Sequence, residues 1–220
     1  VITAVVETEK VQFLWIGTSK EGETITVDWG DGNTDSLMTA KHDNESLYAE
    51  FIVRYKHDYK ESGTHTITIK GNNIIEFGWE QTGALSIDAS KCTTLQSFLC
   101  DYYESIGLTD LNIDGCYDLV ELSLSYCNLT HLDISKYTKL IEFDCAHNQL
   151  TSLDVTKNTA LTKLHCYGNQ LTSLDVRKNT TLTDLSCDNN QLTSLDVTKN
   201  IALTSLRCAD NQLTSLDVTQ

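Results

Sequence analysis

A pattern of apolar positions recurs every 21 residues through the second half of the chain. The leading leucine of each copy occupies equally spaced positions: Leu108, Leu129, Leu150, Leu171, Leu192 and Leu213. Self-similarity at a fixed period of this length is typical of a repeat array, in which each turn of chain stacks on the one before it. The pattern therefore predicts a solenoid. Its turns carry the motif Leu161-x-x-Leu164-x-Cys166-x-x-Asn169-x-Leu171, which has the form of a leucine-rich repeat, so we expect one short strand per turn and a parallel sheet.

Three apolar columns should form the core of this solenoid. Strands of a sheet lie about 4.8 Å apart, so equivalent residues of successive turns make continuous columns. The columns are Leu119, Leu140, Leu161, Leu182 and Leu203; Leu122, Phe143, Leu164, Leu185 and Leu206; and Ile113, Ile134, Val155, Val176 and Val197. Because no single turn can bury such side chains alone, the stacking of turns creates the core.

Residues 1–72 follow a different pattern, in which apolar and polar residues alternate over short runs. The runs are 11–16, 24–27, 49–55 and 64–69, and clusters of Gly, Asp, Asn and Ser separate them. Alternation with β-branched and aromatic residues predicts strands bounded by turns. We expect a small β-sandwich over residues 1–72 and the repeat domain over residues 73–220, so the whole chain should be mainly β.

Two segments of the front region resemble the PKD-like immunoglobulin-type domains of extracellular proteins. They are Val27-Asp-Trp-Gly-Asp-Gly32, at the end of a predicted strand, and His57-Asp-Tyr-Lys-Glu-Ser-Gly63, which leads into the next one. The resemblance covers about a third of the chain. It departs two positions after Gly63, where that family usually has an aromatic residue and this chain has His65.

Asp28, Asp31 and Asp35 cluster near the first of these segments. Carboxylate oxygens suit a calcium ion, but the spacing differs from that of a known calcium loop such as the EF-hand. Asp-Gly pairs also form tight turns, since these residues tolerate positive φ. We interpret the segment as a turn, and we expect no metal and no cofactor.

A cysteine column runs through the repeats. Its members are Cys100, Cys145, Cys166, Cys187 and Cys208. Sulfur atoms in a straight file cannot surround one tetrahedral metal ion, so we expect buried apolar side chains. Cys92 and Cys116 lie on adjacent turns where later repeats have an asparagine such as Asn158. A disulfide between them stays open, although parallel side chains in register rarely reach the required dihedral angle.

Two polar columns have structural interpretations. Asn148, Asn169, Asn190 and Asn211 should bind backbone groups that are freed where the chain leaves each strand. Asp133, Asp154, Asp175 and Asp196 would repel one another if stacked alone, but a lysine follows each of them by three residues. We expect these lysines to neutralise the aspartates.

The repeat Leu-x-Cys-x-x-Asn-x-Leu-x-x-Leu-Asp-Val resembles the cysteine-ladder repeats of internalin-like bacterial surface proteins. The resemblance covers residues 85–218. It implies an exported or surface-anchored recognition protein whose exposed strand face binds partners. With the PKD-like front region, it implies an extracellular or cell-surface location, with any signal or anchor outside this chain.

The net charge of the chain limits the kinds of molecule that it can bind. Sixteen basic residues against 31 acidic residues give a net charge of −15. Such a charge repels phosphate backbones and anionic lipids, so nucleic acid and membrane surfaces are poor partners. No apolar run approaches the roughly 20 residues that span a bilayer, so we expect no membrane insertion by this chain. A protein or a glycan is the expected partner.

A candidate binding face follows from comparing the turns with one another. Exposed loop positions such as Thr151, Thr172 and Thr193 are constant, whereas the outward strand positions vary, so exposure alone does not explain the variation. The face comprises Tyr102, Glu121, Tyr126, Glu142, Asp144, His147, Lys163, His165, Tyr167, Asp184, Asp188 and Arg207. Tyrosine rings beside carboxylates suit either a basic protein patch or a sugar.

Asp144, His165 and Ser186 share one outward column in the order of a catalytic triad. Catalysis would require hydrogen-bond contact and an oxyanion hole, and no glycine-rich elbow accompanies the serine. We expect an ion pair and no enzyme. The favoured function is noncatalytic recognition of a macromolecule, in adhesion. The alternatives are a glycan-binding accessory module of a surface polysaccharide system and a structural spacer.

The chain ends at Asp217-Val-Thr-Gln220 without a polar segment to cover Leu206 and Leu216. Solenoids need capping turns, and bare strand edges invite pairing. We therefore expect either a native chain that continues further or an end-to-end contact between copies.

Overall fold

The computed structural model describes residues 1–8, 11–41, 49–80, 84–101 and 108–217. These residues form sixteen β-strands and no helix, so none of them supplies a helix that could cross a membrane. The chain divides into two compact units, Val1–Leu119 and Val120–Gln220. The prediction of a mainly β chain is confirmed.

One sheet of the first unit has the order β11-β9-β1-β7-β3-β4. Its strands are β1 (Ile2–Thr8), β3 (Thr24–Asp28), β4 (Thr34–Met38), β7 (Gly63–Lys70), β9 (Ala84–Asp88) and β11 (Asp110–Asn112). Successive side chains of a strand point to opposite faces of its sheet. Ile67 and Ile69 on β7 are accordingly buried, whereas Thr66 and Lys70 are exposed.

The other sheet of this unit has the order β10-β8-β2-β6-β5. Its strands are β2 (Val11–Thr18), β5 (Ala40–Lys41), β6 (Phe51–Asp58), β8 (Ile74–Glu80) and β10 (Ser97–Asp101). Leu14 and Ile16 on β2 are buried, and Trp15 between them is partly exposed. Tyr55 on β6 donates a hydrogen bond to the carbonyl of Ile25 on β3 at 2.6 Å, which links the two sheets.

The pairing changes from antiparallel to parallel within the first unit. Strand β8 pairs antiparallel with β2 and parallel with β10, while β9 pairs antiparallel with β1 and parallel with β11. These changes follow Asn73, which has a positive φ of 52° and directly precedes β8. The PKD-like sandwich and the boundary between residues 72 and 73 stay predictions.

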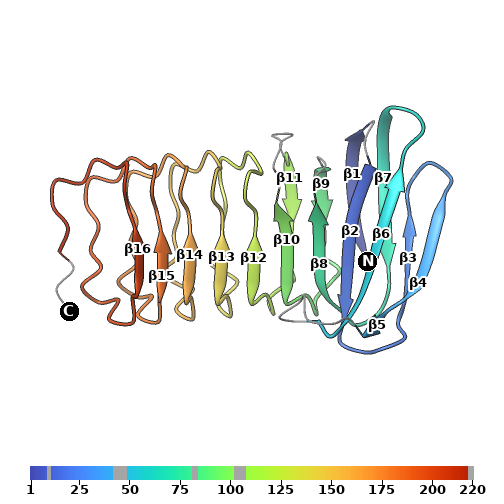
Figure 1. The fold of residues 1–220 in the computed structure, drawn as a ribbon, viewed down its shortest axis with the longest axis horizontal. Helices are drawn as coiled ribbons and strands as arrows, with labels where there is room; N and C mark the ends of the chain where they lie inside the picture. Colours follow the sequence, from blue (N-terminus) through green and yellow to red (C-terminus); the bar gives the residue numbers. More distant parts are fainter. Residues whose placement is uncertain (9–10, 42–48, 81–83, 102–107, 218–220) are drawn as a thin grey trace. The chain divides into compact units, whose positions relative to one another are not determined.

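The second unit is the predicted solenoid. Its strands are β12 (Glu121–Ser123), β13 (Glu142–Asp144), β14 (Lys163–His165), β15 (Asp184–Ser186) and β16 (Ser205–Arg207). They lie side by side in chain order and pair in parallel, each residue opposite the one 21 positions later, as in Glu142↔Lys163 (Figure 1). The period of the sequence is therefore the register of the sheet.

The apolar and cysteine columns point into the repeats as predicted. Leu122, Phe143, Leu164 and Leu185 are all buried, and Leu206 in the last turn is partly exposed. Cys145, Cys166 and Cys187 are buried, and burial raises the pKa of each thiol. All eight cysteines are free. Cys92 and Cys116 therefore form no disulfide, and the Cys116 thiol instead donates to the Ala89 carbonyl at 3.4 Å.

The asparagine column satisfies backbone groups between turns, as expected. Asn169 Nδ2 donates to the carbonyl of Cys145 at 2.9 Å and to that of Cys166 at 3.1 Å, and its Oδ1 accepts from Leu150 N at 3.0 Å. Such bonds matter because unpaired buried backbone groups are costly.

The aspartate column has a second role that the lysine spacing did not reveal. Asp154 Oδ1 accepts from the backbone N–H of Thr156 at 2.8 Å, and Asp133, Asp175 and Asp196 each accept likewise from the residue two positions ahead. Hydrogen bonds from the side chain and then the backbone of Thr156 lower the pKa of Asp154, and Lys157 contributes less. The aspartates therefore mainly stabilise Asx turns, and their interaction with neighbouring positive charges is the smaller contribution.

Candidate functional site

The candidate binding face lies on the outward positions of β12–β16 and the residues that follow each strand. Tyr102 lies outside the described residues. The other predicted members occupy equivalent places on successive turns, so the parallel register brings them together in rows. Lys163 and Arg207 are exposed, and the remaining members are half-buried.

The first row runs through Glu121, Glu142, Lys163 and Asp184, which face one another across β12–β15. Lys163 Nζ lies 2.8 Å from Glu142 Oε1. This hydrogen bond raises the pKa of Lys163. One cation among three carboxylates leaves the row acidic, and an exposed pair of this kind contributes little to stability.

The second row places His165 between two carboxylates. His165 Nδ1 lies 3.5 Å from Asp144 Oδ2, and His165 Nε2 lies 3.5 Å from Asp184 Oδ2. The contact with Asp144 is the main cause that raises the pKa of His165, and Asp184 adds to it. The imidazole therefore bridges β13 and β15 from its place on β14.

Asp144 is the most engaged carboxylate of the face. It accepts hydrogen bonds from Ser125 Oγ at 2.7 Å and from Ala146 N at 2.9 Å. Burial is the largest single influence and acts to raise the pKa of Asp144, but His165, Ser125 and Ala146 together outweigh it and lower the pKa. Asp144 is therefore held as a carboxylate.

The order Asp144, His165, Ser186 does not produce the contacts of a catalytic triad. Both ring nitrogens of His165 lie against carboxylates, and Ser186 is only 4% exposed. A nucleophilic serine needs its hydroxyl in hydrogen-bond reach of the base and open to substrate. The ion pair expected from the sequence is present, with Asp184 as an additional partner.

A row of aromatic rings borders the charged rows. Tyr126 stacks on His147 with ring centroids 4.2 Å apart, and His147 meets Tyr167 edge-on at 4.9 Å. Tyr126 and His147 have positive φ values of 60° and 52°, and Gly168 follows in the same column at 68°. A Cβ on Gly168 would lie 2.6 Å from His147 Nδ1, so this glycine leaves room for the histidine ring.

The Asp-Trp-Gly-Asp-Gly segment of the first unit forms the predicted turn. Asp31 accepts from Asn33 N at 3.0 Å and contacts His57 Nε2 at 2.9 Å, while Asp35 accepts from Trp29 Nε1 at 2.7 Å. Burial acts to raise the pKa of Asp31, but the bonds from Asn33 and His57 lower it to about 2. These carboxylates are therefore occupied by protein donors.

Aromatic rings connect this turn to β7. Trp29 stacks on His57 at 4.6 Å, and Tyr59 stacks on His65 at 4.0 Å. His65 is the position at which the chain departs from the PKD-like pattern, and its imidazole still supplies a ring contact there.

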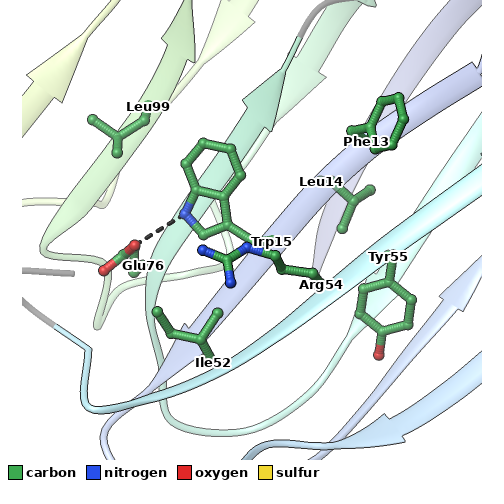
Figure 2. Close-up of a pocket in the computed structure, with 8 residues that line it drawn as sticks. All are labelled: Phe13, Leu14, Trp15, Ile52, Arg54, Tyr55, Glu76 and Leu99. Carbon is green, nitrogen blue, oxygen red and sulfur yellow. Dashed lines mark hydrogen bonds between the residues drawn. The ribbon is translucent and has the colours of Figure 1, made fainter. Parts of the chain in front are cut away.

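The sequence interpretation missed a pocket on the outer face of the β10-β8-β2-β6 sheet. It has a volume of about 260 Å³ and is lined by side chains that include Phe13, Trp15, Arg54, Glu76 and Leu99 (Figure 2). Trp15 Nε1 donates to Glu76 Oε1 at 2.9 Å. Trp15 at an outward position of an alternating strand was the available signal, but its partners come from three other strands.

The described residues contain no group of three His, Cys, Asp or Glu side chains that could hold a metal ion. The chemistry of the candidate face is instead that of hydrogen-bond acceptors and ring faces.

No protein-family model and no curated protein matches this chain. Among solved structures, the functional domain of InlJ from Listeria monocytogenes, which includes a cysteine ladder, matches with a TM-score of 0.54 and 38% identity. That match covers 60% of this chain and 29% of the InlJ chain. The similarity agrees with a leucine-rich-repeat solenoid that carries a buried cysteine column.

Two further solved structures match more weakly. A leucine-rich-repeat protein of Leptospira interrogans matches with a TM-score of 0.42 and 22% identity, over 58% of this chain and 46% of its own. The internalin InlF of Listeria monocytogenes matches with a TM-score of 0.41 and 18% identity, over 58% of this chain and 51% of its own.

Proposed function

We propose that this chain is a noncatalytic recognition module that binds a protein through the outward face of β12–β16. The observation that carries the proposal is the composition of this face. The face has five carboxylates on successive turns of the parallel sheet, and only two permanent cations, Lys163 and Arg207, lie among them. The carboxylates are those of Glu121, Glu142, Asp144, Asp184 and Asp188. A cationic protein surface is the complementary partner, because opposite potentials steer encounter and fix orientation.

The packing of the rings favours a protein over a glycan on this face. A sugar stacks on an open ring face, but one face of His147 is covered by Tyr126, and Tyr167 packs against His147 at an interplanar angle of 85°. Rings packed in this way present a rigid, partly apolar border, and Tyr is enriched in protein interfaces for that reason.

The proposed partner complex is weak and transient. Five strands about 4.8 Å apart make a face only about 20 Å long. A standard interface needs about 800 Å² from each partner, which such a face does not reach by itself. The resemblance of the repeats to internalin-like surface proteins supports adhesion and an extracellular or cell-surface location as parts of the same proposal.

Photo-crosslinking suits a weak complex. A photoreactive amino acid in place of Tyr167 should capture a protein from the surface of intact cells, and the yield should fall as salt rises, because screening weakens surface electrostatics. The same photoreactive residue in place of Thr193, an exposed and constant loop position, is the control and should capture far less.

Charge reversal then tests the chemistry. The double variant Asp184→Lys, Asp188→Lys should lose the crosslink at position 167, whereas Thr193→Lys changes charge on the loop side and should keep it. Equal capture from positions 167 and 193, or capture that survives the double reversal, would contradict the proposal and favour the structural-spacer alternative.

A further inference from the structure

We infer that the pocket on the outer face of the β10-β8-β2-β6 sheet binds one pyranose ring of a neutral glycan. This site lies in the first unit and shares no residue with the proposed protein-binding face, so each inference can fail without the other. The argument rests on a held indole ring, a pair of opposite charges and the size of the cavity (Figure 2).

The indole of Trp15 is held in position before any ligand arrives. Its ring lies across the β8 backbone, because a Cβ added to Gly78 would come within 1.8 Å of Trp15 Cε2. The hydrogen bond from Trp15 Nε1 to Glu76 Oε1 sets the ring's direction, and the ring packs against the cluster of Ala49, Ile52 and Ile75. A preorganised aromatic side chain binds with less loss of conformational entropy.

Two side chains of opposite charge, Glu76 and Arg54, line the pocket. Glu76 is 3% exposed and comes from β8, whereas Arg54 is exposed and comes from β6. A cationic ligand would meet the guanidinium, and an anionic ligand would meet a buried carboxylate, so a neutral ligand with both donors and acceptors fits best.

The cavity has room for one substituted ring. Its volume is about 260 Å³, whereas an engineered cavity of about 150 Å³ holds benzene and pockets for drug-sized ligands start near 300 Å³. A pyranose combines an apolar C–H face for the Trp15 ring with hydroxyls for Glu76 and Arg54. Ile52 and Leu99 supply apolar walls for its remaining carbons.

Tryptophan fluorescence can report on this pocket alone. The chain has three tryptophans, and Trp29 and Trp79 are 0% and 1% exposed. Quenching by acrylamide therefore reads Trp15. A panel of methyl pyranosides and N-acetylhexosamines should include at least one sugar that protects Trp15 from the quencher, with saturable dependence on sugar concentration. Methylammonium and acetate serve as charged probes and should give no protection.

Variants test whether the sugar that protects Trp15 binds in this pocket. Ligand-detected NMR measures the binding of that sugar to each variant. Trp15→Ala should weaken binding by about tenfold or more, since an aromatic contact contributes on that scale. Gly78→Ala keeps every lining residue but displaces the indole, and should weaken binding as well. Arg54→Ala should weaken binding, whereas Lys70→Ala removes one exposed positive charge elsewhere and should not.

Melting curves and far-UV circular dichroism establish that each variant is folded. If Trp15→Ala does not fold, the test is the comparison of sugar binding between Arg54→Ala and Lys70→Ala. Arg54 is exposed, so its substitution should leave the fold intact. No protection of Trp15 by any sugar, binding that persists in Trp15→Ala, or protection by the cationic probe alone would each overturn the inference.

Discussion

The two units build β-structure by different means. In Val1–Leu119, strands of up to eight residues, such as β2 and β6, are held by the continuous backbone ladder between them. In Val120–Gln220 each strand has three residues, and buried asparagine amides satisfy backbone groups in the rest of the turn. The first unit should therefore be sensitive to changes in backbone geometry, and the second to the loss of particular polar side chains.

Glycines show the same difference. A Cβ on Gly30, in the first unit, would meet the backbone oxygen of Thr66 at 2.5 Å, and backbone of a paired strand cannot move aside. A Cβ on Gly168, in the second unit, would meet the side chain of His147, which can rotate. Both glycines have positive φ, so the obstructing atom is what separates them.

The largest expected effect is that of Gly30→Ala. Positive φ costs roughly 1–3 kcal/mol and forced overpacking roughly 1–3 kcal/mol more, so the free energy of unfolding should fall by about 2–6 kcal/mol. Urea denaturation measures it. The control is Gly32→Ala, where φ is also positive at 92° but a Cβ would meet nothing within 4 Å. Equal losses in the two variants would refute the backbone clash.

Asn169→Ala should cause the next largest loss of stability. It removes the acceptor for Leu150 N, whereas Cys145 O keeps Asn148 Nδ2 as a donor and Cys166 O keeps Asn190 Nδ2. A buried group left unpaired costs roughly 1–3 kcal/mol. We expect the free energy of unfolding to fall by about 1–3 kcal/mol. Gln170→Ala, at the exposed neighbouring position, should change it by less than about 0.5 kcal/mol. A similar result for both would mean that the amide column is dispensable.

Gly168→Ala should cost only about 1–2 kcal/mol, which is the strain of a left-handed backbone. The His147 ring should leave its position, and its NMR signals should lose the ring-current shift from Tyr126. A loss of stability as large as that of Gly30→Ala would show that the repeat turn is as rigid as the antiparallel unit.

The smallest effect is the pH dependence of the His165 bridge. Because its pKa is raised above the ordinary 6.5, the contribution of His165 is fully present below pH 6.5 and is lost as pH rises through the raised value. The pKa of Asp144 is lowered from 3.8, so its contribution is present above pH 3.8 and is lost as pH falls through the lowered value. Both operate fully between about pH 3.8 and 6.5.

His165→Gln tests this window. The difference in the free energy of unfolding between the native chain and the variant should be greatest between pH 4 and 6.5 and should shrink in alkaline solution. Asp144→Asn should lower the pKa of His165 in an NMR titration. A pKa of His165 that does not respond to Asp144→Asn would disprove the pairing.

The repeat unit could be predicted largely from the sequence. The repeat position that Leu164 occupies has equivalent neighbours on successive turns, so the burial of Leu164 follows from the 21-residue period alone. The same period placed Asp144 beside His165. It did not reveal that His165 also reaches Asp184, nor that Asp154 binds Thr156 N, because these contacts depend on side-chain rotamers and on turn geometry.

The sequence by itself determined the parallel register, the buried columns and the residues of the candidate face, because a local period repeats the same contacts without reference to distant residues. Only the tertiary structure decided which carboxylates share His165 and where the Trp15 pocket lies. Trp15, Arg54, Glu76 and Leu99 come from four strands far apart in the chain. Their pairing follows from how β2, β6, β8 and β10 align, and no single segment of sequence contains that alignment.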